Sequence, residues 1–525
     1  MQLKNKDHIT MIGAGLAGPV MASYLSGQGY SVEIYEKRED MRLVNQSAGR
    51  SINLALSKRG IKALEDIGVL DEIKPMMLPM VGRMIHDMEG GVHLQKYGQR
   101  STEVIFSISR AFLNKTLMDH VETKGNVDIT FNHTLNKVDL QNDKLHFDDQ
   151  ILSFNRLLGS DGSSSAIRNA MDQSSNINFR KEPLDHGYKE LTIPKDPEGN
   201  YRMDPEALHI WPRGEFMLIA LPNMDRSFTC TLFFPLDGKI SFSTLTSEEK
   251  IKEFFGSYFP DTLELIPDLI SEYKENPIGK LATVYCDKFH FEDKALIFGD
   301  AAHAIVPFFG QGMNASFQDC TVVNKLITKH DGKWGNVFSD FSKYHVPNGH
   351  AIANMALENY IEMRDSVNDP HFKRRRELEF ELEEKFNEES GLAEVFITFE
   401  NGKTLNYLRN YNGFGLMAHS ITLIDLALVQ LTDPRSRIIL GKIKREYEEE
   451  QERAREEEER RRREQNGGKS ESKNMSTIQL GGKKLKFGDG KIENIQSGRM
   501  VSIKGKKGTE IIMNGGVCLD KLFKK

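Results

Sequence analysis

The sequence predicts an α/β protein in which a Rossmann-like domain carries an inserted antiparallel sheet and is followed by a mostly helical C-terminal region. Three observations predict this class. Near the N-terminus a glycine-rich turn and a helix of small residues join two apolar strands, as in dinucleotide-binding folds. Between residues 181 and 286 strands of mixed apolar and polar residues indicate an antiparallel sheet. Around residue 300 a further apolar strand ends in an aspartate, and glycines open the helix after it.

The N-terminal turn, within residues 8–38, has the spacing of a dinucleotide-binding motif. Gly13 permits a tight turn, Gly15 allows the backbone to approach a pyrophosphate, and Gly18 allows the helix to pack on the sheet. The amides at the helix N-terminus would hold the phosphates. Glu36 ends the second strand and is placed to accept hydrogen bonds from a ribose. The alternative is a doubly wound fold that binds no nucleotide.

Composition indicates a large globular protein. The chain has 525 residues, of which 39% are hydrophobic and 28% charged, and its net charge is −6. This length predicts more than one domain, and a negative net charge gives no argument for a nucleic-acid partner. Four cysteines without Cys-x-x-Cys spacing favour a reduced protein with no structural zinc or other metal site. They are Cys230, Cys286, Cys320 and Cys518.

No segment has the pattern of a leader peptide or a membrane span. Residues 1–7 are short and polar, unlike a signal sequence. The most apolar late segment, residues 415–431, is interrupted by His419, Asp425 and Gln430, so it falls short of the ~20 apolar residues that a span requires. We therefore expect a cytoplasmic protein.

A polar loop with a strand follows the first motif. Ile52, Leu54 and Leu56 alternate within residues 49–60 and predict a strand, before a helix that begins at about Lys58. A loop that re-enters the sheet directly after a dinucleotide motif is placed to meet the far part of a long cofactor. The alternative is an ordinary strand with a basic flank.

Residues 81–97 predict a hairpin with a three-residue turn at residues 89–91. With glycine in the left-handed position of that turn, Arg83 would face Tyr97, with Cβ atoms about 5 Å apart on one face. A guanidinium beside a phenol makes a receptor for a carboxylate, because arginine offers a planar fork of donors. The alternative is a solvent-facing cross-strand pair.

A strand at residues 156–159 leads into Asp161 and Gly162, and a helix follows. Two interpretations stay open for this junction. The aspartate caps the helix, or both residues border a second nucleotide.

Residues 294–314 predict a second ligand-binding junction. A buried strand delivers Asp300 at its C-terminal end, where ligands bind in open α/β sheets. Ala301 and Ala302 leave room for a bulky neighbour, and the aspartate can accept hydrogen bonds from ribityl hydroxyls. Gly312 opens a helix whose N-terminal amides suit an anionic ring. Two glycine-bearing junctions in one domain fit a long cofactor such as FAD better than two unrelated turns.

The C-terminal third is predicted to be largely helical. Residues 347–364 predict a helix with Pro347 in its first turn, and Asn359, Glu362 and Met363 share a face of it that lines either the core or a site. Further predicted elements are charged helices at 373–389 and 442–465, a flexible linker at 466–475 and a small β module at 478–518. The predicted division is an FAD-binding domain (1–75, 101–180, 287–370), a substrate-binding sheet domain (76–100, 181–286), a helical cap (371–441), a charged helix (442–465) and a basic tail (466–525).

Seven motifs between Ile9 and Arg364 together resemble the kynurenine 3-monooxygenases, a family of the class A flavin-dependent aromatic hydroxylases. GDAAH belongs to the whole class, whereas RSINLALS and NYIEMR point to the kynurenine enzymes. The motifs are GAGLAG at 13–18, RSINLALS at 50–57, GRMIH at 82–86, HIWPR at 209–213, GDAAH at 299–303, PFFGQGMN at 307–314 and NYIEMR at 359–364.

The resemblance implies an FAD enzyme that hydroxylates L-kynurenine at the ring carbon ortho to its amino group, a step of tryptophan degradation and NAD biosynthesis. NADPH would reduce the flavin, and O2 would then add to give a C4a-hydroperoxide that the ring attacks. NADPH would visit transiently, since no second dinucleotide fold is visible. The protein would bind, orient and exclude water, so no catalytic acid–base pair is required.

The resemblance also implies which residues contact each ligand. Kynurenine would be held by Arg83, Tyr97 and Asn359. The loop between flavin and substrate would be lined by Pro307, Phe308 and Phe309. With the motif glycines included, the predicted FAD contacts are Gly13, Gly15, Ala17, Gly18, Tyr35, Glu36, Lys37, Arg38, Ala55, Arg110, Leu135, Asp300, Gly312, Met313 and Asn314.

The match weakens beyond about Pro370. Glu394 stands where the family usually offers a tyrosine to the substrate, and Tyr407 or Tyr411 would have to replace it. Two alternatives therefore stay open. One is a related flavin hydroxylase with another aromatic substrate. The other is a flavoprotein scaffold that binds a partner or a second copy through its C-terminal region, with the charged helix at 442–465.

Overall fold

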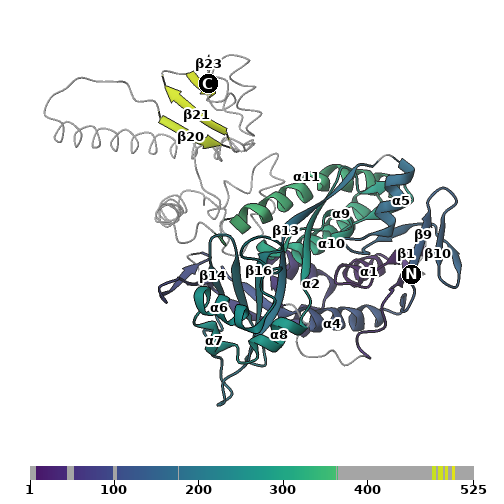
Figure 1. Ribbon diagram of the computed structural model, residues 1–525. Helices are drawn as coiled ribbons and strands as arrows, with labels where there is room; N and C mark the ends of the chain where they lie inside the picture. The colour runs from purple at the N-terminus through teal and green to yellow at the C-terminus, as the bar shows by residue number, and fades with distance from the viewer. Residues whose placement is uncertain are drawn as a thin grey trace, which may run out of the picture. The chain divides into compact units, whose positions relative to one another are not determined.

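The computed structural model describes residues 8–43, 53–98, 103–175, 177–361 and 363–364, together with four strands between residues 476 and 502. The chain divides into two compact units, Met1–Lys373 with Asn410–Gly415, and Arg374–Arg409 with Leu416–Lys525 (Figure 1). The predictions that lie outside the described residues are the helical cap at 371–441, the charged helices at 373–389 and 442–465, the linker at 466–475, the segment 415–431, Ile52, Glu362, Glu394, Tyr407, Tyr411 and Cys518.

A six-stranded sheet lies at the centre of the first unit. Its order is β18-β19-β12-β1-β2-β8, and all neighbours are parallel except β18 and β19. Ile9, Met11 and Ile34 are fully buried in it, as expected for a parallel sheet covered by helices. This sheet confirms the Rossmann-like part of the predicted fold class. The strands are β1 (His8–Ile12), β2 (Ser31–Tyr35), β8 (Val127–Thr130), β12 (Leu157–Gly159), β18 (His290–Phe291) and β19 (Ala295–Ile297).

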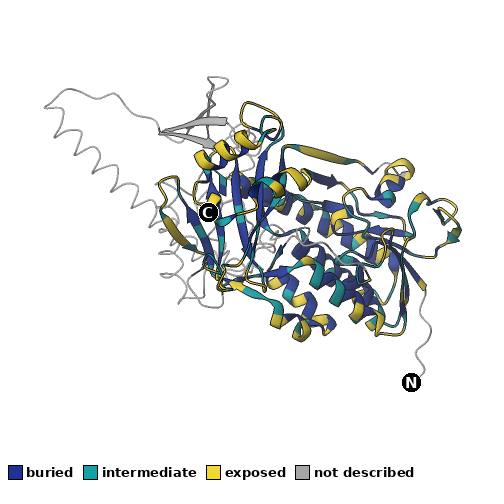
Figure 2. Cartoon of the chain, turned by 60° about the horizontal axis from the view of Figure 1, so that its bottom comes forward, coloured by how far each residue is buried: buried dark blue, intermediate teal, exposed yellow. Residues whose placement is uncertain are grey.

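Helices from distant parts of the chain pack beside this sheet. Helix α10 contacts α1, α2 and α11, and α1 also contacts α4. Figure 2 shows the strands of this unit largely buried and its helices exposed on their outer side. No described helix is long and apolar enough to cross a bilayer. The helices are α1 (Ala17–Gly27), α2 (Lys58–Ile67), α3 (Leu70–Ile73), α4 (Arg110–Glu122), α5 (Ala166–Ser175), α9 (Asp300–His303), α10 (Gly312–Lys329) and α11 (Trp334–Ile361), with 3-10 turns η1 (Lys74–Met76) and η2 (Pro307–Phe309).

The first unit also contains two small three-stranded sheets. The first has the order β3-β7-β4, with β3 (Asn53–Leu56), β7 (Ile105–Ser109) and β4 (Leu78–Met80). The second has the order β11-β10-β9, with β9 (Leu135–Asp139), β10 (Lys144–Phe147) and β11 (Ile151–Ser153). β3 corresponds to the strand that the sequence predicts after the first motif.

A seven-stranded sheet forms the inserted part of the unit, in the order β17-β13-β16-β15-β14-β5-β6. It is antiparallel, as predicted, except that β5 pairs in parallel with β14. β5 comes from a separate segment of the chain, so no hairpin joins it to β14 and a parallel pairing is possible. Helices α6 (Glu248–Tyr258), α7 (Thr262–Leu265) and α8 (Leu269–Glu275) bury an aromatic core that includes Trp211 and Phe255. The strands are β5 (Gly82–His86), β6 (Val92–Lys96), β13 (Phe179–Ile193), β14 (Ala207–Pro212), β15 (Met217–Pro222), β16 (Phe228–Pro235) and β17 (Gly279–Cys286).

The predicted register of the β5–β6 hairpin is wrong. Arg83 lies opposite Gln95, not Tyr97, because the backbone N–H of Asp87 donates to the carbonyl of Gly91 and closes the turn one residue earlier than predicted. Gly90 takes the left-handed position, with φ of 87°. Since the error shifts the pairing by two residues, Arg83 and Tyr97 still lie on the same face of the sheet.

The predicted start of the late helix is also wrong. Helix α11 runs through Pro347, which lies inside it. The proline removes one N–H, so the carbonyl of Lys343 loses its helical partner. Buried residues on both sides of the proline, such as Phe341 and Ile352, keep the helix continuous, because tertiary packing outweighs the local cost of the proline.

The second unit contains an antiparallel four-stranded sheet in the order β20-β21-β22-β23. Its strands are β20 (Ser476–Leu480), β21 (Lys483–Gly488), β22 (Lys491–Asn494) and β23 (Arg499–Ser502). They overlap the β module that the sequence predicts at 478–518, but β20 begins two residues before it. The domain boundaries drawn from the sequence stay predictions.

Candidate active site

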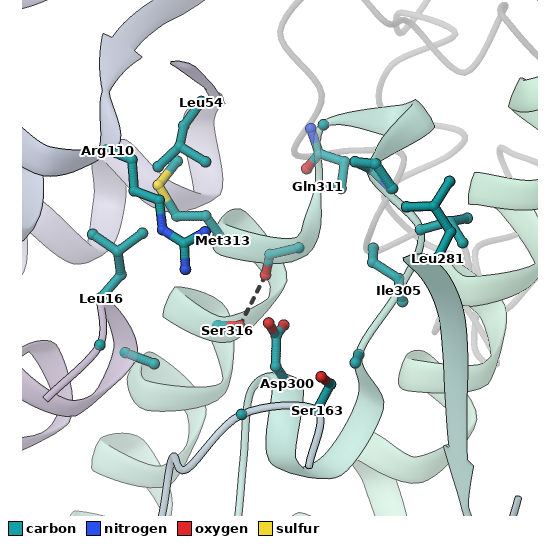
Figure 3. Close-up of a pocket in the computed structure, with 18 of the residues that line it drawn as sticks. Leu16, Leu54, Arg110, Ser163, Leu281, Asp300, Ile305, Gln311, Met313 and Ser316 are labelled. Atoms are coloured by element: carbon teal, nitrogen blue, oxygen red, sulfur yellow. Dashed lines mark hydrogen bonds between the residues drawn. The ribbon is translucent and has the colours of Figure 1, made fainter. Parts of the chain in front are cut away.

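The first unit encloses a cavity of about 1050 Å³. This volume lies at the upper end of the ~300–1,000 Å³ typical of ligand sites. Residues of the glycine turn, the Asp300 junction and the seven-stranded sheet line it. Figure 3 shows Asp300 and Ser163 at one edge of this space, with Arg110 and Met313 on another side.

The first glycine turn is shaped so that only glycine fits at its start. Gly13 has φ of 100°, and a Cβ there would lie 2.5 Å from the carbonyl oxygen of Ser160. At Gly18 a Cβ would lie 2.1 Å from the carbonyl oxygen of Gly13. Nothing lies within 4 Å of a Cβ built at Gly15. The turn therefore leaves its backbone at Gly15 open to a phosphate group.

Glu36 closes the turn from the end of β2. Its buried carboxylate accepts hydrogen bonds from the backbone N–H of Ala14, 2.8 Å, and from Nε of Arg38, 2.7 Å. Burial alone would raise the pKa of Glu36, but the bonds and charge of Arg38 and the amide of Ala14 outweigh it and lower the pKa. An ionised acceptor thus lines the cavity next to the turn.

Asp300 stands at the N-terminus of α9, directly after β19. Gly299 precedes it with φ of 58°, and its backbone N–H donates to Oδ2 of Asp319, 2.8 Å. Ala301 and Ala302 are fully buried, whereas Asp300 is exposed into the cavity (Figure 3). The strand-to-helix junction therefore presents the Asp300 carboxylate to the cavity, and its contact with FAD stays a prediction.

Three buried residues behind this junction form a cluster that sequence reasoning missed. His303, Asp319 and His345, here named the histidine cluster, come from α9, α10 and α11 and are 2%, 0% and 3% exposed. Nε2 of His303 lies 2.6 Å from Oδ2 of Asp319, and Nδ1 of His345 lies 3.1 Å from Oδ1. His303, in the GDAAH motif, was the only available sequence signal.

In the histidine cluster, the Asp319 carboxylate and the imidazoles stabilise each other's charged forms. Burial would raise the pKa of Asp319, but the two imidazoles outweigh it and lower that pKa. Burial would lower the pKa of His303, but the charge and hydrogen bond of Asp319 outweigh it and raise that pKa. An aspartate shared by three elements, and bonded to the N–H of Gly299, therefore fixes the position of the Asp300 turn.

Asn314 supports the cavity from behind. It is fully buried; its Nδ2 donates to the carbonyl of Ala55, 2.8 Å, and its Oδ1 accepts from the backbone N–H of Ser57, 2.9 Å. A Cβ at Gly310 would lie 2.9 Å from the Cβ of Ala55. The hydrogen bonds of Asn314 join β3 to α10. As a result, Ala55 and Met313 line the same cavity.

Arg83, Tyr97 and Asn359, here named the arginine cluster, meet at the cavity from β5, the end of the β5–β6 hairpin and α11. They are 4%, 3% and 1% exposed, and all three line the cavity. Nη2 of Arg83 donates to Oδ1 of Asn359, 3.0 Å. Burial raises the pKa of Tyr97, and the charge and hydrogen bond of Arg83 partly offset this, leaving it at about 12. The alternative of a solvent-facing pair is wrong.

The 3-10 turn η2, residues 307–309, contacts the arginine cluster. Nδ2 of Asn359 donates to the carbonyl of Phe308, 2.8 Å. The ring of Phe308 stacks on Tyr360 at 3.7 Å and meets Phe233 edge-on at 4.9 Å. Pro307 and Phe309 also line the cavity. An apolar wall thus adjoins the arginine cluster.

The cavity brings together most of the residues predicted from the sequence. Gly18 and Asn314 are not among its lining residues, although both position residues that are. Asp161 caps α5, because it accepts a hydrogen bond from the backbone N–H of Ala166, 2.8 Å. It also lines the cavity, and its contact with a second nucleotide stays a prediction. The predicted residues that line it are Gly13, Gly15, Ala17, Tyr35, Glu36, Lys37, Arg38, Arg83, Ala55, Tyr97, Arg110, Leu135, Asp300, Pro307, Phe309, Gly312, Met313 and Asn359.

Comparison with known proteins identifies the class of protein to which the fold belongs. The family model of the FAD binding domain matches residues 7–337. Among solved structures, 2-methyl-3-hydroxypyridine-5-carboxylic acid oxygenase has 18% identity and a TM-score of 0.57, over 70% of this chain and 95% of that one. Klebsiella pneumoniae HpxO, complexed with FAD and uric acid, has 15% identity and a TM-score of 0.55, over 69% and 89%. The fold is that of the FAD-binding aromatic hydroxylases.

Closer relatives narrow the class. The kynurenine 3-monooxygenase of Myxococcus xanthus is 45% identical over 72% of this chain and 83% of its own length. That of Dictyostelium discoideum is 42% identical over 73% and 86%. The present chain belongs to the kynurenine 3-monooxygenase family of FAD-dependent monooxygenases.

Proposed function

We propose that this protein hydroxylates L-kynurenine to 3-hydroxykynurenine with FAD as cofactor. One O2 and one NADPH with a proton are consumed; one oxygen atom enters the ring, and the other leaves as water with NADP+ as second product. The observation that carries the proposal is the arginine cluster, which lines the same cavity as the glycine turn and Asp300. A carboxylate receptor thus adjoins a dinucleotide site.

The residues of the cavity fit FAD. The open backbone at Gly15 and the N-terminus of α1 suit its pyrophosphate, and the ionised carboxylate of Glu36 suits ribose hydroxyls. Asp300 would accept bonds from the ribityl chain, and the α10 N-terminus at Gly312 would face the ring system. When bound, FAD supplies the redox chemistry, since it takes a hydride from NADPH and delivers oxygen from O2. The remaining predicted FAD contacts are proposed on the same basis.

The arginine cluster would hold the amino-acid end of kynurenine. The guanidinium of Arg83 offers charge-assisted hydrogen bonds to the carboxylate, and Asn359 fixes its orientation through the 3.0 Å bond. Because its pKa is about 12, Tyr97 keeps its proton at neutral pH, so its hydroxyl can donate a hydrogen bond to the carboxylate. The wall of Pro307, Phe308 and Phe309 would keep water from the reacting ring.

Anaerobic reduction by NADPH tests the proposal directly. The holoenzyme is mixed with NADPH with and without kynurenine, and after oxygen is admitted the product is identified by mass spectrometry. We expect kynurenine to accelerate flavin reduction and to gain one oxygen atom. Equal stimulation by another aromatic compound, with kynurenine unmodified, would support the rival substrate. Partner capture without any turnover would support the scaffold alternative.

Location and assembly are part of the same proposal. The buried thiols Cys230, Cys286 and Cys320 are free, which supports a reducing compartment such as the cytoplasm. Contacts with a second copy or another protein are assigned to the C-terminal region, residues 442–525. Cell fractionation tests the first statement, and light scattering of the chain before and after truncation at Lys442 tests the second.

A further inference from the structure

One wall of the cavity is formed by the two long strands β13 and β17. They pair antiparallel, with Pro183 opposite Ala282, and a bulge follows before Lys280 pairs with Gly187. Residues at alternate positions point to one face of a strand. Those of this face that line the cavity, here named the lysine strip, are Lys181, Pro183, Lys280 and Ala282.

The two lysines of the strip carry charges that no described neighbour compensates. Both are exposed, and within the described ranges neither ammonium group has a hydrogen bond or ion pair. Arg180, which alternates with Lys181 along β13, is different. Its guanidinium lies 4.1 Å from the ring centre of Tyr285 and pairs with Glu182. Of these three described cations, the two without a hydrogen bond or ion pair are therefore those that line the cavity.

The strip borders the part of the cavity beside α9. The backbone N–H of Val284 in β17 donates to the carbonyl of Ala304, 2.8 Å, directly after that helix, and Ala304 lines the cavity. In Figure 3, Leu281 of β17 lies beside Ile305, across the view from Leu16 of the glycine turn. The phosphates held by that turn are therefore not those that the strip would meet.

We propose that the lysine strip docks the phosphate groups of the nicotinamide coenzyme during flavin reduction, an inference that rests on the proposed function. Kynurenine has no phosphate, and its carboxylate is assigned to Arg83. NADPH carries a pyrophosphate and a 2′-phosphate, which call for two separated cations. Four residues of extended strand separate the position of Lys280 from that opposite Lys181, about 13 Å. Between them the small Pro183 and Ala282 leave room for a ligand to lie along the strip.

The exposure of the strip suits a coenzyme that must leave after each reduction. Ion pairs at exposed lysines contribute little binding free energy and are screened by salt. A coenzyme held in this way binds weakly and dissociates readily, whereas the buried arginine cluster holds its ligand by stronger contacts. Affinity for NADPH should accordingly fall as ionic strength rises.

The test compares two double variants of the full-length holoenzyme. Lys181→Gln with Lys280→Gln removes the strip charges. Lys195→Gln with Lys239→Gln removes the same charge from exposed positions that do not line the cavity. Binding of NADP+ is measured by calorimetry, and the NADPH concentration dependence of anaerobic reduction gives Kd and the limiting rate separately. Binding of kynurenine is followed by flavin absorbance.

The strip variant should raise Kd for NADP+ and NADPH about tenfold, a factor of about three for each exposed contact, with an unchanged limiting rate. The control should bind as the parent protein does. A larger rise in Kd for NADPH than for NADH would indicate that the lysine strip contacts the 2′-phosphate. Equal rises would indicate that it contacts the pyrophosphate. Unchanged coenzyme Kd, or a changed Kd for kynurenine instead, would overturn the inference. If NADPH fails to reduce the parent protein, the proposed function itself is wrong.

Each single variant, Lys181→Gln and Lys280→Gln, guards against a folding artefact. Both side chains are exposed, so the thermal transition and the FAD content should match the parent protein. Each should raise Kd for NADP+ by about threefold. An effect in the double variant that neither single variant shares, accompanied by lost FAD, would overturn the docking role.

Discussion

The histidine cluster and the arginine cluster are both buried, and both join three elements, but they deal with charge in opposite ways. Asp319 lies between two imidazoles at 2.6 and 3.1 Å, so the charges compensate each other inside the protein. Arg83 donates to the neutral amide of Asn359 and lies beside the neutral phenol of Tyr97, facing the cavity. The first arrangement holds the fold, and the second is suited to an anionic ligand.

The difference shows where a buried charge contributes to stability and where to binding. Removing one member of a buried pair leaves the other charge uncompensated, at a large cost in folding free energy. A buried cation that faces a cavity is instead compensated when the ligand arrives. Substitutions should therefore separate the clusters, with Asp319 changing the free energy of unfolding and Arg83 changing substrate affinity.

The largest effect is expected for Asp319→Asn. It breaks the pair with His303 and weakens the acceptor for the N–H of Gly299, so the free energy of unfolding should fall by about 3–5 kcal/mol. Denaturant unfolding of the holoenzyme and apoenzyme measures it. A fall of less than about 1 kcal/mol, as for surface pairs, would contradict the compensated-charge interpretation.

The same variant should change the pH dependence of stability. The pKa of His303 is raised in the fold, so its contribution is complete below its ordinary value of 6.5 and is lost as pH rises through the folded value. The pKa of Asp319 is lowered, so its contribution is complete above 3.8 and is lost as pH falls through the folded value. The difference in Tm between the parent protein and Asp319→Asn should be largest between pH 3.8 and pH 6.5, and it should shrink at alkaline pH.

Arg83→Ala should have the next largest effect, on binding. Loss of the charge-assisted contact should weaken the binding free energy of kynurenine by about 2–5 kcal/mol, which raises Kd by a factor of at least ~30. Titration followed by flavin absorbance measures it. The decarboxylated amine analogue of kynurenine is the matched control, because its affinity should be nearly the same in both proteins. Unchanged kynurenine affinity would remove Arg83 from its assigned role.

Tyr97→Phe should have a smaller effect of the same kind. It removes one neutral donor, worth about 0.5–1.5 kcal/mol, so Kd for kynurenine should rise by up to about tenfold. The parent should keep its affinity between pH 7 and 9, because the pKa of Tyr97 is about 12. A fall in parent affinity over that range, absent in the variant, would show that the phenol ionises earlier.

The smallest effect is expected for Asp340→Asn, the matched control for Asp319. Asp340 also lies beside two basic side chains, His330 at 2.8 Å and Lys329 at 3.1 Å, but its own side chain is 26% exposed. Its loss should lower the free energy of unfolding by less than about 1 kcal/mol. Equal losses at both positions would mean that burial does not distinguish these clusters.

The sequence predicts the geometry of the glycine turn and the Asp300 junction better than that of the arginine cluster. The glycine turn and the Asp300 junction are local, since each depends on a few consecutive residues that restrict the backbone. The arginine cluster depends on the β5–β6 register, which one residue of turn position changes, and on α11, whose start the proline obscured. The histidine cluster and the lysine strip were missed because their members become neighbours only through helix packing and strand pairing.

The parallel pairing of β5 with β14 has a consequence for how the chain acquires its fold. Residues 82–85 pair with residues 207–210, so the strand that carries Arg83 reaches its final neighbour only after more than a hundred further residues have left the ribosome. Long-range pairings of this kind form slowly. The glycine turn of β1 and α1 can be complete much earlier, and the arginine cluster is assembled after it.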